Sequence, residues 1–230
     1  MAKLISVVGN PGTGKSTSIS FLNPDETAVI NVSGKMLPFK GAKKKYISLK
    51  DNKEKFNYLE TDNTESIAKV LNHINLKRPE IHQVIIDDAG YLISFESMGR
   101  SLETGWNKYT EISSHFFDVV KSAKDMREDL TVIFMFHDEL EENGTTGITK
   151  RIIKVASKSI KKNLEPEGLF AIVLFTEVTQ DPDGKTRYNF ITNDGITCTA
   201  KTPMGLYDEK YIPNNLQLLM DRIKKYELED

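Results

Sequence analysis

The sequence predicts an α/β protein with a mainly parallel central sheet and an antiparallel hairpin at one edge. Short apolar segments alternate with helical segments up to residue 136, an order typical of parallel strands joined by helices. Further along, two β-rich segments, residues 169–178 and 186–193, flank Asp181-Pro182-Asp183-Gly184, a turn sequence typical of hairpins. The chain has 230 residues, and we expect residues 1–230 to form a single domain.

Four apolar segments are the expected strands of the parallel part. Residues 4–8 lead into a glycine-rich loop, residues 27–32 are rich in β-branched side chains, and residues 84–86 are followed by two acids. Residues 130–136 are continuously apolar, which is typical of an interior strand that is buried on both faces. Residues 46–49 are a further short strand candidate within an irregular stretch.

Helices are expected between these strands. Residues 15–22 follow the glycine-rich loop, and Thr64 begins a helix that ends before Pro79, because apolar residues recur there at three-to-four spacing. Pro213 suits the start of the last helix. The polar residues 138–149 are expected to form a loop. The other expected helices are residues 105–129, 152–164 and 214–226.

Composition excludes several classes of protein. Hydrophobic residues make up 39% and charged residues 28% of the chain, which argues against disorder. No apolar run approaches the roughly 20 residues that span a bilayer, and no signal peptide precedes the glycine-rich loop, so we expect a cytoplasmic protein without membrane contact. A single cysteine, Cys198, allows neither an internal disulfide nor a cysteine cluster for zinc.

Basic residues are concentrated locally, although the net charge is only −2. Residues 35–55 contain eight lysines and two acids, and residues 150–162 contain six basic residues and no acid. Any site for nucleic acid must therefore be local, because the whole molecule has too little charge to hold a polyanion.

The strongest motif is Gly9-Asn10-Pro11-Gly12-Thr13-Gly14-Lys15-Ser16, which has the pattern G-x-x-x-x-G-K-[ST]. Glycines let successive backbone N–H groups converge on phosphate oxygens, and the helix that follows adds its positive end. We expect the loop through Thr17 to bind ATP or GTP, with Lys15 on the β- and γ-phosphates and Ser16 on Mg²⁺.

Polar residues follow two of the expected strands. Asp87 ends one strand and is the expected Mg²⁺ partner, directly or through water, while Asp88 is placed to polarise the attacking water. His137 directly follows the strand at 130–136 and could sense the γ-phosphate if that strand lies beside the one carrying Asp87. The alternatives are a solvent-facing carboxylate for Asp88 and a structural role for His137.

This layout resembles the RecA/KaiC-like ATPases, and more narrowly the small phage RecA-core ATPases called the Sak-four group of single-strand annealing proteins. Besides the glycine-rich loop, Asp87-Asp88 and His137, the likeness comes from NVSGKMLPFKG at 31–41 and AKTPMG at 200–205. The resemblance implies a RecA-like P-loop sandwich, hydrolysis of ATP rather than GTP, and annealing or recombination of phage DNA in the host cytoplasm. The implied partners are single-stranded DNA, further copies of the chain in a ring or filament, and other phage replication or recombination proteins.

The resemblance also assigns candidate residues. The loop 138–149 would face DNA, followed by a basic helix on which Lys150, Lys154, Lys158 and Lys161 share one face at spacings of four, four and three. A neighbouring subunit would contribute a basic residue, for which the candidates are Lys185, Arg187 and Lys201. No separate module precedes the glycine-rich loop, so we expect any ring or filament to form through the core.

Two features depart from the RecA pattern. RecA carries a glutamate base at the end of the strand after the glycine-loop helix, whereas this sequence has Asn31-Val32-Ser33-Gly34 there, which shifts the base to Asp88 or leaves turnover slow. The expected DNA loop begins with acids, which would repel phosphate, so the lysine-rich residues 35–55 are an alternative contact surface.

Two other functions are compatible with the motif. One is a small-molecule kinase, for example of nucleosides, which would need a lid of arginines over the transferred phosphoryl group. The other is a nucleotide-gated loader of DNA or protein with negligible turnover. The arginines are dispersed along the chain at positions 78, 100, 127, 151, 187 and 222.

Overall fold

The computed structural model describes residues 1–144, 147–157, 160 and 165–229. Its strands are β1 (Lys3–Val8), β2 (Thr27–Asn31), β3 (Tyr58–Glu60), β4 (Gln83–Asp87), β5 (Thr131–Phe136), β6 (Asp138–Glu142), β7 (Thr149–Ile153), β8 (Ile172–Gln180), β9 (Thr186–Ile191) and β10 (Tyr211–Pro213). Its helices are η1 (Ser16–Phe21), α1 (Ala42–Lys45), α2 (Thr64–Lys77), α3 (Tyr91–Gly99), α4 (Asn107–Lys124), η2 (Pro166–Leu169) and α6 (Leu216–Glu229), of which η1 and η2 are 3₁₀ helices.

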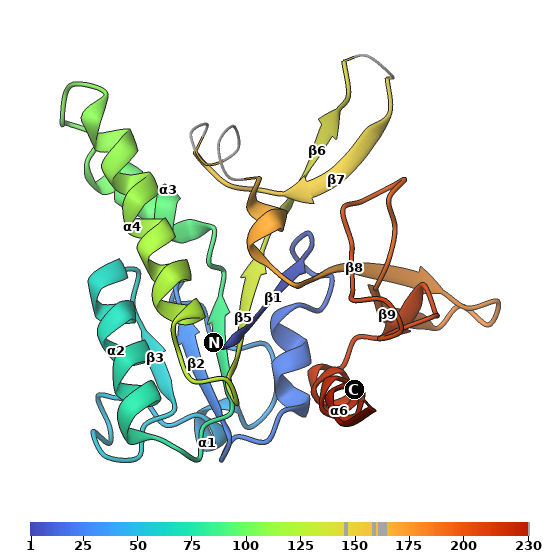
Figure 1. Cartoon of the computed structure of the whole chain (residues 1–230), viewed down its shortest axis with the longest axis horizontal. Coiled ribbons are helices and arrows are strands. Elements are labelled where there is room, and N and C mark those ends of the chain that lie inside the picture. Colours follow the sequence, from blue (N-terminus) through green and yellow to red (C-terminus); the bar gives the residue numbers. More distant parts are fainter. Residues whose placement is uncertain (145–146, 158–159, 161–164, 230) are drawn as a thin grey trace.

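The centre of the protein is an eight-stranded sheet in the order β10-β9-β8-β1-β5-β4-β2-β3 (Figure 1). The strands from β8 to β3 are parallel, whereas β9 is antiparallel to both β8 and β10. The protein is therefore α/β, with a mainly parallel central sheet and an antiparallel hairpin, β8–β9, toward one edge, as the sequence predicts. No helix in the described part of the chain is long and apolar enough to cross a membrane.

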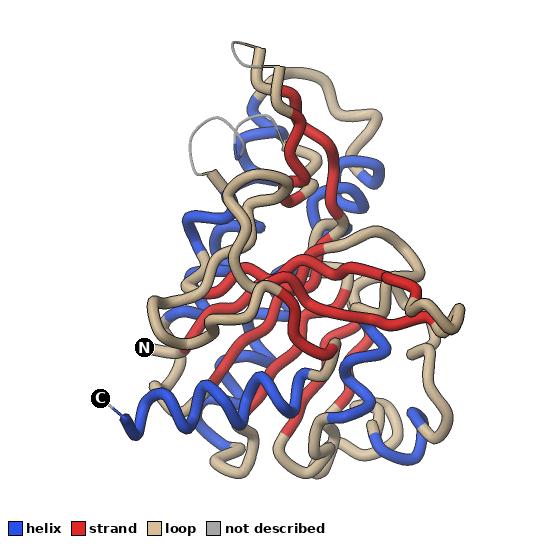
Figure 2. The backbone as a smooth tube through the Cα atoms, turned by 90° about the vertical axis from the view of Figure 1, so that its right-hand side faces the viewer, coloured by secondary structure: helices blue, strands red, loops and turns tan. Residues whose placement is uncertain are grey.

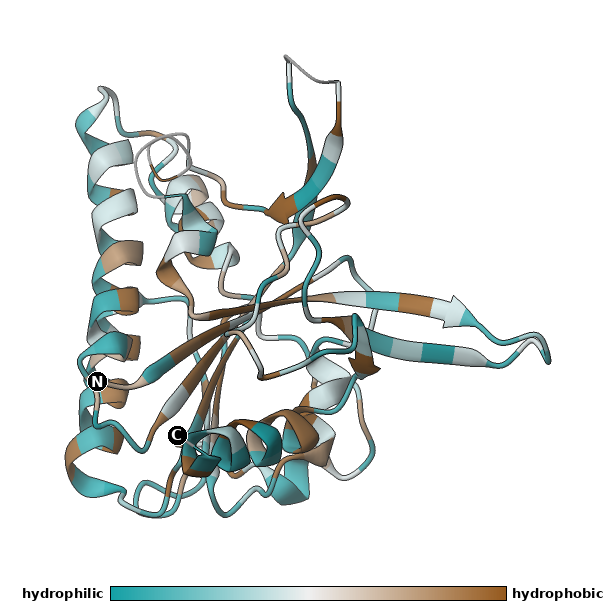
Figure 3. Cartoon of the chain, turned by 45° about the vertical axis from the view of Figure 1, so that its right-hand side comes forward, coloured by the Kyte–Doolittle hydropathy of each residue, from teal (hydrophilic) through white to brown (hydrophobic). Residues whose placement is uncertain are grey.

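Both faces of the central strands are buried, which explains why these strands are continuously apolar. In β5, Val132, Phe134 and Phe136 pack in the cluster that includes α2 and α4, whereas Ile133 and Met135 pack in the cluster that includes η1 and α6. Figure 3 shows hydrophobic residues concentrated along these strands. The sheet is thus held rigidly between two layers of helices, and its strand ends are fixed in position.

Helix starts follow local capping signals. The side chain of Asn63 accepts a hydrogen bond from the Ser66 N–H (2.8 Å), and α2 begins at Thr64 as predicted. The last helix differs from its prediction, because Pro213 lies in β10 and the cap is Asn215, whose side-chain oxygen accepts from the N–H of Gln217 (2.9 Å).

Several elements differ from the predictions. Residues 16–21 form a 3₁₀ helix, in keeping with a sequence of serines, a threonine and a β-branched isoleucine, which are weak α-helix formers. The predicted helix at 105–129 is shorter, α3 was not predicted, and no strand forms at 46–49, where Ser48 makes only an isolated bridge to Tyr58.

The largest error concerns residues 138–153. The predicted loop and the start of the predicted helix at 152 are instead the two strands of an antiparallel hairpin, β6–β7, which projects from the main sheet (Figure 2). Opposite charges pair across it, as where Glu141 faces Lys150, and the β-branched residues of β7 favour a strand. Lys150 lies in β7 and Lys154 just after it, so these two do not share a helical face; Lys158 and Lys161 lie outside the described residues.

Candidate functional site

A cavity of about 700 Å³ lies at the C-terminal ends of the parallel strands. The glycine-rich loop (residues 9–16) follows β1, Ser33 and Lys35 follow β2, Asp87-Asp88 end β4, and His137 follows β5. In open α/β sheets, ligands bind at this edge because the strand ends and their loops meet there. The volume is within the range of small-molecule sites, roughly 300–1,000 Å³.

The glycine-rich loop needs its glycines for two physical reasons. Gly12 and Gly14 have φ angles of 80° and 94°, in a region that favours glycine. Gly9 lies so close to β8 that an added Cβ would be 1.7 Å from the Thr176 hydroxyl oxygen. The loop is therefore a tightly packed turn rather than a flexible connection.

Lys15 is buried beneath this loop, with only 5% of its surface exposed. Its ammonium donates hydrogen bonds to the backbone carbonyls of Gly9 (2.5 Å) and Asn10 (3.1 Å). Burial lowers the pKa of the Lys15 ammonium, an effect that the negative charges of Asp88 and Asp87 oppose. Lys15 is thus a cation placed at the floor of the cavity beside two carboxylates.

Ser16 and Asp87 lie together at the end of the loop. The Ser16 hydroxyl donates a hydrogen bond to Asp87 Oδ1 (3.0 Å), and Asp87 is only 4% exposed. Burial first, and then the neighbouring charge of Asp88, raise the pKa of Asp87 to about 6. Two oxygen ligands of the kind that Mg²⁺ prefers are therefore adjacent.

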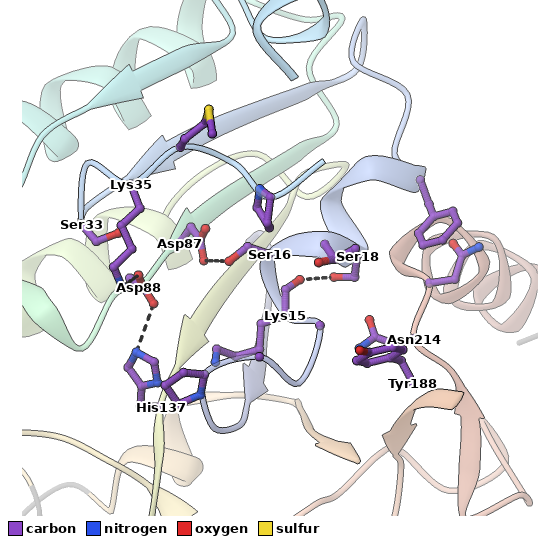
Figure 4. Close-up of a pocket in the computed structure, with 18 of the residues that line it drawn as sticks. Lys15, Ser16, Ser18, Ser33, Lys35, Asp87, Asp88, His137, Tyr188 and Asn214 are labelled. Atoms are coloured by element: carbon purple, nitrogen blue, oxygen red, sulfur yellow. Dashed lines mark hydrogen bonds and ion pairs between the residues drawn. The ribbon is translucent and has the colours of Figure 1, made fainter. Parts of the chain in front are cut away.

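Asp88 adopts a left-handed backbone conformation, with φ at 57°. Non-glycine residues rarely adopt this conformation, and such strain is concentrated at functional sites. Its carboxylate lies 3.3 Å from Lys35 Nζ and 3.4 Å from His137 Nε2 (Figure 4). Burial opposes ionisation of Asp88, but His137 and the nearby Ser33 hydroxyl outweigh this effect, and the pKa of Asp88 falls well below its usual range. Asp88 is therefore an ionised carboxylate inside the cavity.

The role expected for His137 requires its strand to lie beside the strand that carries Asp87, and β5 does lie beside β4. Strand β5 pairs with β1 on one side and with β4 on the other, so His137 emerges between the glycine-rich loop and Asp87-Asp88. Its ring contacts the Tyr91 ring edge-on at 5.5 Å between centroids. His137 thus lines the cavity from the strand between the two motifs.

Sequence reasoning missed Ser33 and Lys35 as cavity residues. They lie on a turn that the buried Asn31 side chain holds in place, because Asn31 Oδ1 accepts from the Gly34 N–H (3.1 Å) and Nδ2 donates to the Lys35 carbonyl (2.5 Å). The one available signal was their position directly after the strand at 27–32. Asn31 therefore organises the turn that carries Ser33 and Lys35.

The opposite wall comes from residues near the C-terminus, which sequence reasoning also missed. Tyr188 and Asn214 line it, and Figure 4 shows both across Lys15 from Asp88. Asn214 Nδ2 donates to the Thr13 carbonyl (3.2 Å), so this wall contacts the glycine-rich loop directly. No local sequence pattern indicates these positions, because they lie about 170 to 200 residues from the loop in the chain.

The glycine-rich loop also contacts the root of the β6–β7 hairpin. Asn10 Nδ2 donates to Asp138 Oδ2 (3.4 Å), and that carboxylate pairs with Arg151 Nε at 2.7 Å. Arg151 also pairs with Glu177 (2.9 Å) and donates to the Thr176 carbonyl (3.0 Å). Asp138 thus ties the hairpin to the loop, and Arg151 ties it to β8.

The remaining basic candidates lie elsewhere. Among the residues that line the cavity in the described part of the chain, none is Lys185, Arg187 or Lys201, and Arg187 pairs with Asp181 (2.5 Å). Lys150 donates to the Gly195 carbonyl, and Lys154 lines a smaller cavity of about 240 Å³ that also includes His137.

Comparison of the sequence with models of protein families and with curated proteins gives no match.

Proposed function

We propose that the protein is a Mg²⁺-dependent ATP hydrolase with a RecA-like P-loop sandwich fold. One observation carries the proposal: Lys15, the Ser16–Asp87 pair and the Asp88–His137 pair line one cavity at the ends of three adjacent strands. This set combines a phosphate-binding cation, two metal-binding oxygens and an ionised carboxylate next to an imidazole. Those are the groups that phosphoryl transfer to water requires.

The donor atoms fit Mg²⁺. This ion is typically held by only one or two protein ligands, the rest being water and phosphate oxygens. Ser16 Oγ and Asp87 Oδ1, 3.0 Å apart, would supply that pair. No group of three or more His, Cys, Asp or Glu that could hold a metal exists among the described residues, which agrees with a site completed by the substrate. Bound there, Mg²⁺ would neutralise charge on the terminal phosphates.

Each residue has a role in the proposed hydrolysis. The loop N–H groups from Gly12 to Thr17 and the Lys15 ammonium hold the phosphates, with Lys15 leaving its carbonyl partners to do so. Asp88 accepts a hydrogen bond from the attacking water and orients it, and His137 keeps that carboxylate in place and contacts the γ-phosphate. Catalysis is then mainly positioning and charge stabilisation.

The resemblance to RecA/KaiC-like ATPases adds single-stranded DNA, self-association and DNA annealing to the proposal. The structure bears on where DNA would bind. The β6–β7 hairpin carries Glu139, Glu141 and Glu142 on β6, and Glu141 faces Lys150 of β7. By contrast, the lysines of residues 35–55 are all exposed, with two acids among them. We therefore favour the lysine-rich stretch as the contact for DNA phosphates.

A second candidate, phosphoryl transfer to a small molecule, is favoured by one feature. A second cavity, of about 480 Å³, shares Lys35 and Met36 with the first and also contains Tyr58 and Glu60. An acceptor bound there would lie beside the terminal phosphate. No arginine lines either cavity in the described part of the chain, which argues against a clamp of the kinase type.

The decisive experiment measures steady-state hydrolysis of ATP and GTP with Mg²⁺, with and without single-stranded DNA. We expect ATP turnover that DNA increases and that Lys15→Ala reduces by about 10²-fold or more, since it removes a cation from the transferring phosphoryl group. Lys224→Ala is the matched control, because Lys224 is exposed, lies outside residues 35–55 and does not line the cavity.

Three results would contradict parts of this proposal. Turnover that Lys15→Ala leaves intact would remove the hydrolase assignment. Turnover that DNA does not change, with DNA also without effect on nucleotide affinity, would remove the DNA assignment. Transfer of labelled phosphate to an added nucleoside rather than to water would establish the kinase instead.

A further inference from the structure

The cavity contains a second lysine whose side chain is placed differently from that of Lys15. Lys35 Nζ lies 3.3 Å from Asp88 Oδ2 and 5.3 Å from the centroid of the Tyr91 ring. The Lys35 side chain is 66% exposed, whereas its partner Asp88 is 9% exposed. The ammonium therefore extends from solvent over the mouth of the cavity onto the carboxylate that we assign to the attacking water.

The backbone that carries Lys35 is held firmly. Asn31 is 1% exposed, and its side chain makes hydrogen bonds to both ends of the turn: Nδ2 donates to the Lys35 carbonyl, and Oδ1 accepts from the Gly34 N–H. Nδ2 also donates to the Tyr58 hydroxyl (2.8 Å), which ties the turn to β3. A fixed backbone with an exposed, flexible side chain lets Lys35 change partner without moving the turn.

The charges of the site leave a role for this lysine. Among the residues that line the cavity in the described ranges, Lys15 and Lys35 are the only lysines or arginines, and Asp87 and Asp88 balance them. A bound triphosphate adds several negative charges, and the γ-phosphate gains more contact with cations in the transition state. The basic residues considered for action from a neighbouring subunit, Lys185, Arg187 and Lys201, do not line the cavity.

We propose that Lys35 is a second phosphate-binding lysine, acting within its own subunit, that pairs with Asp88 in the nucleotide-free site and moves to the terminal phosphate when a triphosphate binds. This inference rests on the proposed function. The move frees Asp88 to orient water. The water oxygen then bonds to phosphorus, the bond from phosphorus to the bridging oxygen of the leaving diphosphate breaks, and both protons of the water leave with inorganic phosphate. A diphosphate lacks the group that Lys35 contacts.

The first test is equilibrium binding of a non-hydrolysable triphosphate analogue and of the diphosphate, without DNA. Lys35→Ala is expected to weaken binding of the triphosphate about tenfold, the value of one charge-assisted contact, and to leave diphosphate binding unchanged. ATP turnover of Lys35→Ala is expected to fall about 10²-fold. Lys35→Arg is expected to keep part of the triphosphate affinity and part of the turnover. Lys224→Ala, an exposed lysine outside residues 35–55 and outside the cavity, is the control and should match wild type.

The second test distinguishes action within a subunit from action on a neighbour. Lys15→Ala and Lys35→Ala proteins are mixed and their hydrolysis is measured. If Lys35 serves its own site, the mixture stays as inactive as its components. Recovered activity would show that an intact Lys35 in one subunit serves the nucleotide of another, and would overturn the proposal.

Failure of this inference is separable from failure of the proposed function. Absence of Lys15-dependent turnover in wild type removes the hydrolase itself. If wild type hydrolyses ATP and Lys35→Ala equals Lys224→Ala in turnover and in triphosphate preference, the role of Lys35 alone is removed. Because Lys35 is largely exposed, unfolding curves of the two variants are expected to coincide.

Discussion

The strand ends at the cavity and the β6–β7 hairpin are next to each other in the chain but are built differently. His137 directly follows β5 and lines the cavity, and Asp138 is the first residue of the hairpin. At the cavity, side chains extend from strands whose residues are buried on both faces. In the hairpin, burial is confined to the root, where Asp138 and Ile153 face each other.

This difference separates a region with fixed side chains from one that is held by few contacts. Strand ends in a packed sheet hold side chains in fixed positions, which the proposed hydrolysis would require. The hairpin is held by few buried groups, chiefly the Asp138–Arg151 pair, so its outer part contributes little to the core. The predictions below test whether the two regions respond as differently as their construction implies.

The largest expected effect is at the strand end. Asp87→Asn removes a negative metal ligand and should lower Mg²⁺-dependent ATP turnover by about 10²-fold or more, because the metal loses its charged partner. The Ser16 hydroxyl can still donate to the amide oxygen, so the fold should persist. Turnover and its Mg²⁺ dependence are measured together. Unchanged Mg²⁺ dependence would show that Asp87 is not a ligand.

The same change should stabilise the nucleotide-free protein at neutral pH. Burial raises the pKa of Asp87 from 3.8 to about 6, so the folded state binds this proton more tightly than the unfolded state. The contribution of Asp87 to the free energy of unfolding therefore falls as pH rises from about 4 to 6, by about 3 kcal/mol at most. It stays at the lower value above that range. Asn cannot ionise, so urea unfolding of the variant against wild type should show a gain at pH 7.5 and little gain at pH 4. Equal differences at both pH values would contradict the pKa.

The next effect concerns the root of the hairpin. Arg151→Met leaves the Asp138 carboxylate, whose side chain is 3% exposed, without its charged partner, and should cost about 3 kcal/mol of unfolding free energy. Arg187→Met is the matched control, since the Arg187 side chain in its ion pair is 66% exposed and should contribute less than about 1 kcal/mol. Urea unfolding measures both. Equal costs would mean that the hairpin is not fastened by this pair.

The smallest effect separates the two candidate surfaces for DNA. Replacing Lys43, Lys44 and Lys45 with Ala should weaken single-stranded DNA binding about tenfold and reduce the salt slope by about 2, as expected for three lost phosphate contacts. Lys150→Ala combined with Lys154→Ala should change affinity less, because acids line the opposite strand of the hairpin. Fluorescence anisotropy across a salt series measures both. If the Lys150 and Lys154 double variant lost more affinity than the triple variant, the DNA contact would lie on the hairpin instead.

The predictions from sequence succeeded where the signal is local. The start of α2 depends on Asn63 and the apolar spacing after it, and the end of β4 depends on an apolar run that stops at two acids. The β6–β7 hairpin was missed because residues 150–161 have basic spacing that fits a helix, whereas the partner strand that makes β7 a strand lies at 138–142. The spacing of residues within one segment does not reveal which other segment pairs with it as a strand.

The sequence by itself determined the glycine-rich loop, the acids at the end of β4, and the alternation of strands and helices, because each depends on residues within one short segment. Only the tertiary structure decided which strands are neighbours, and hence that His137 stands between Lys15 and Asp88. It also brought Lys35 onto Asp88 and Asn214 onto the glycine-rich loop. Those contacts join residues that are 53 and about 200 positions apart in the chain, and they form because packing of both sheet faces fixes where every strand ends.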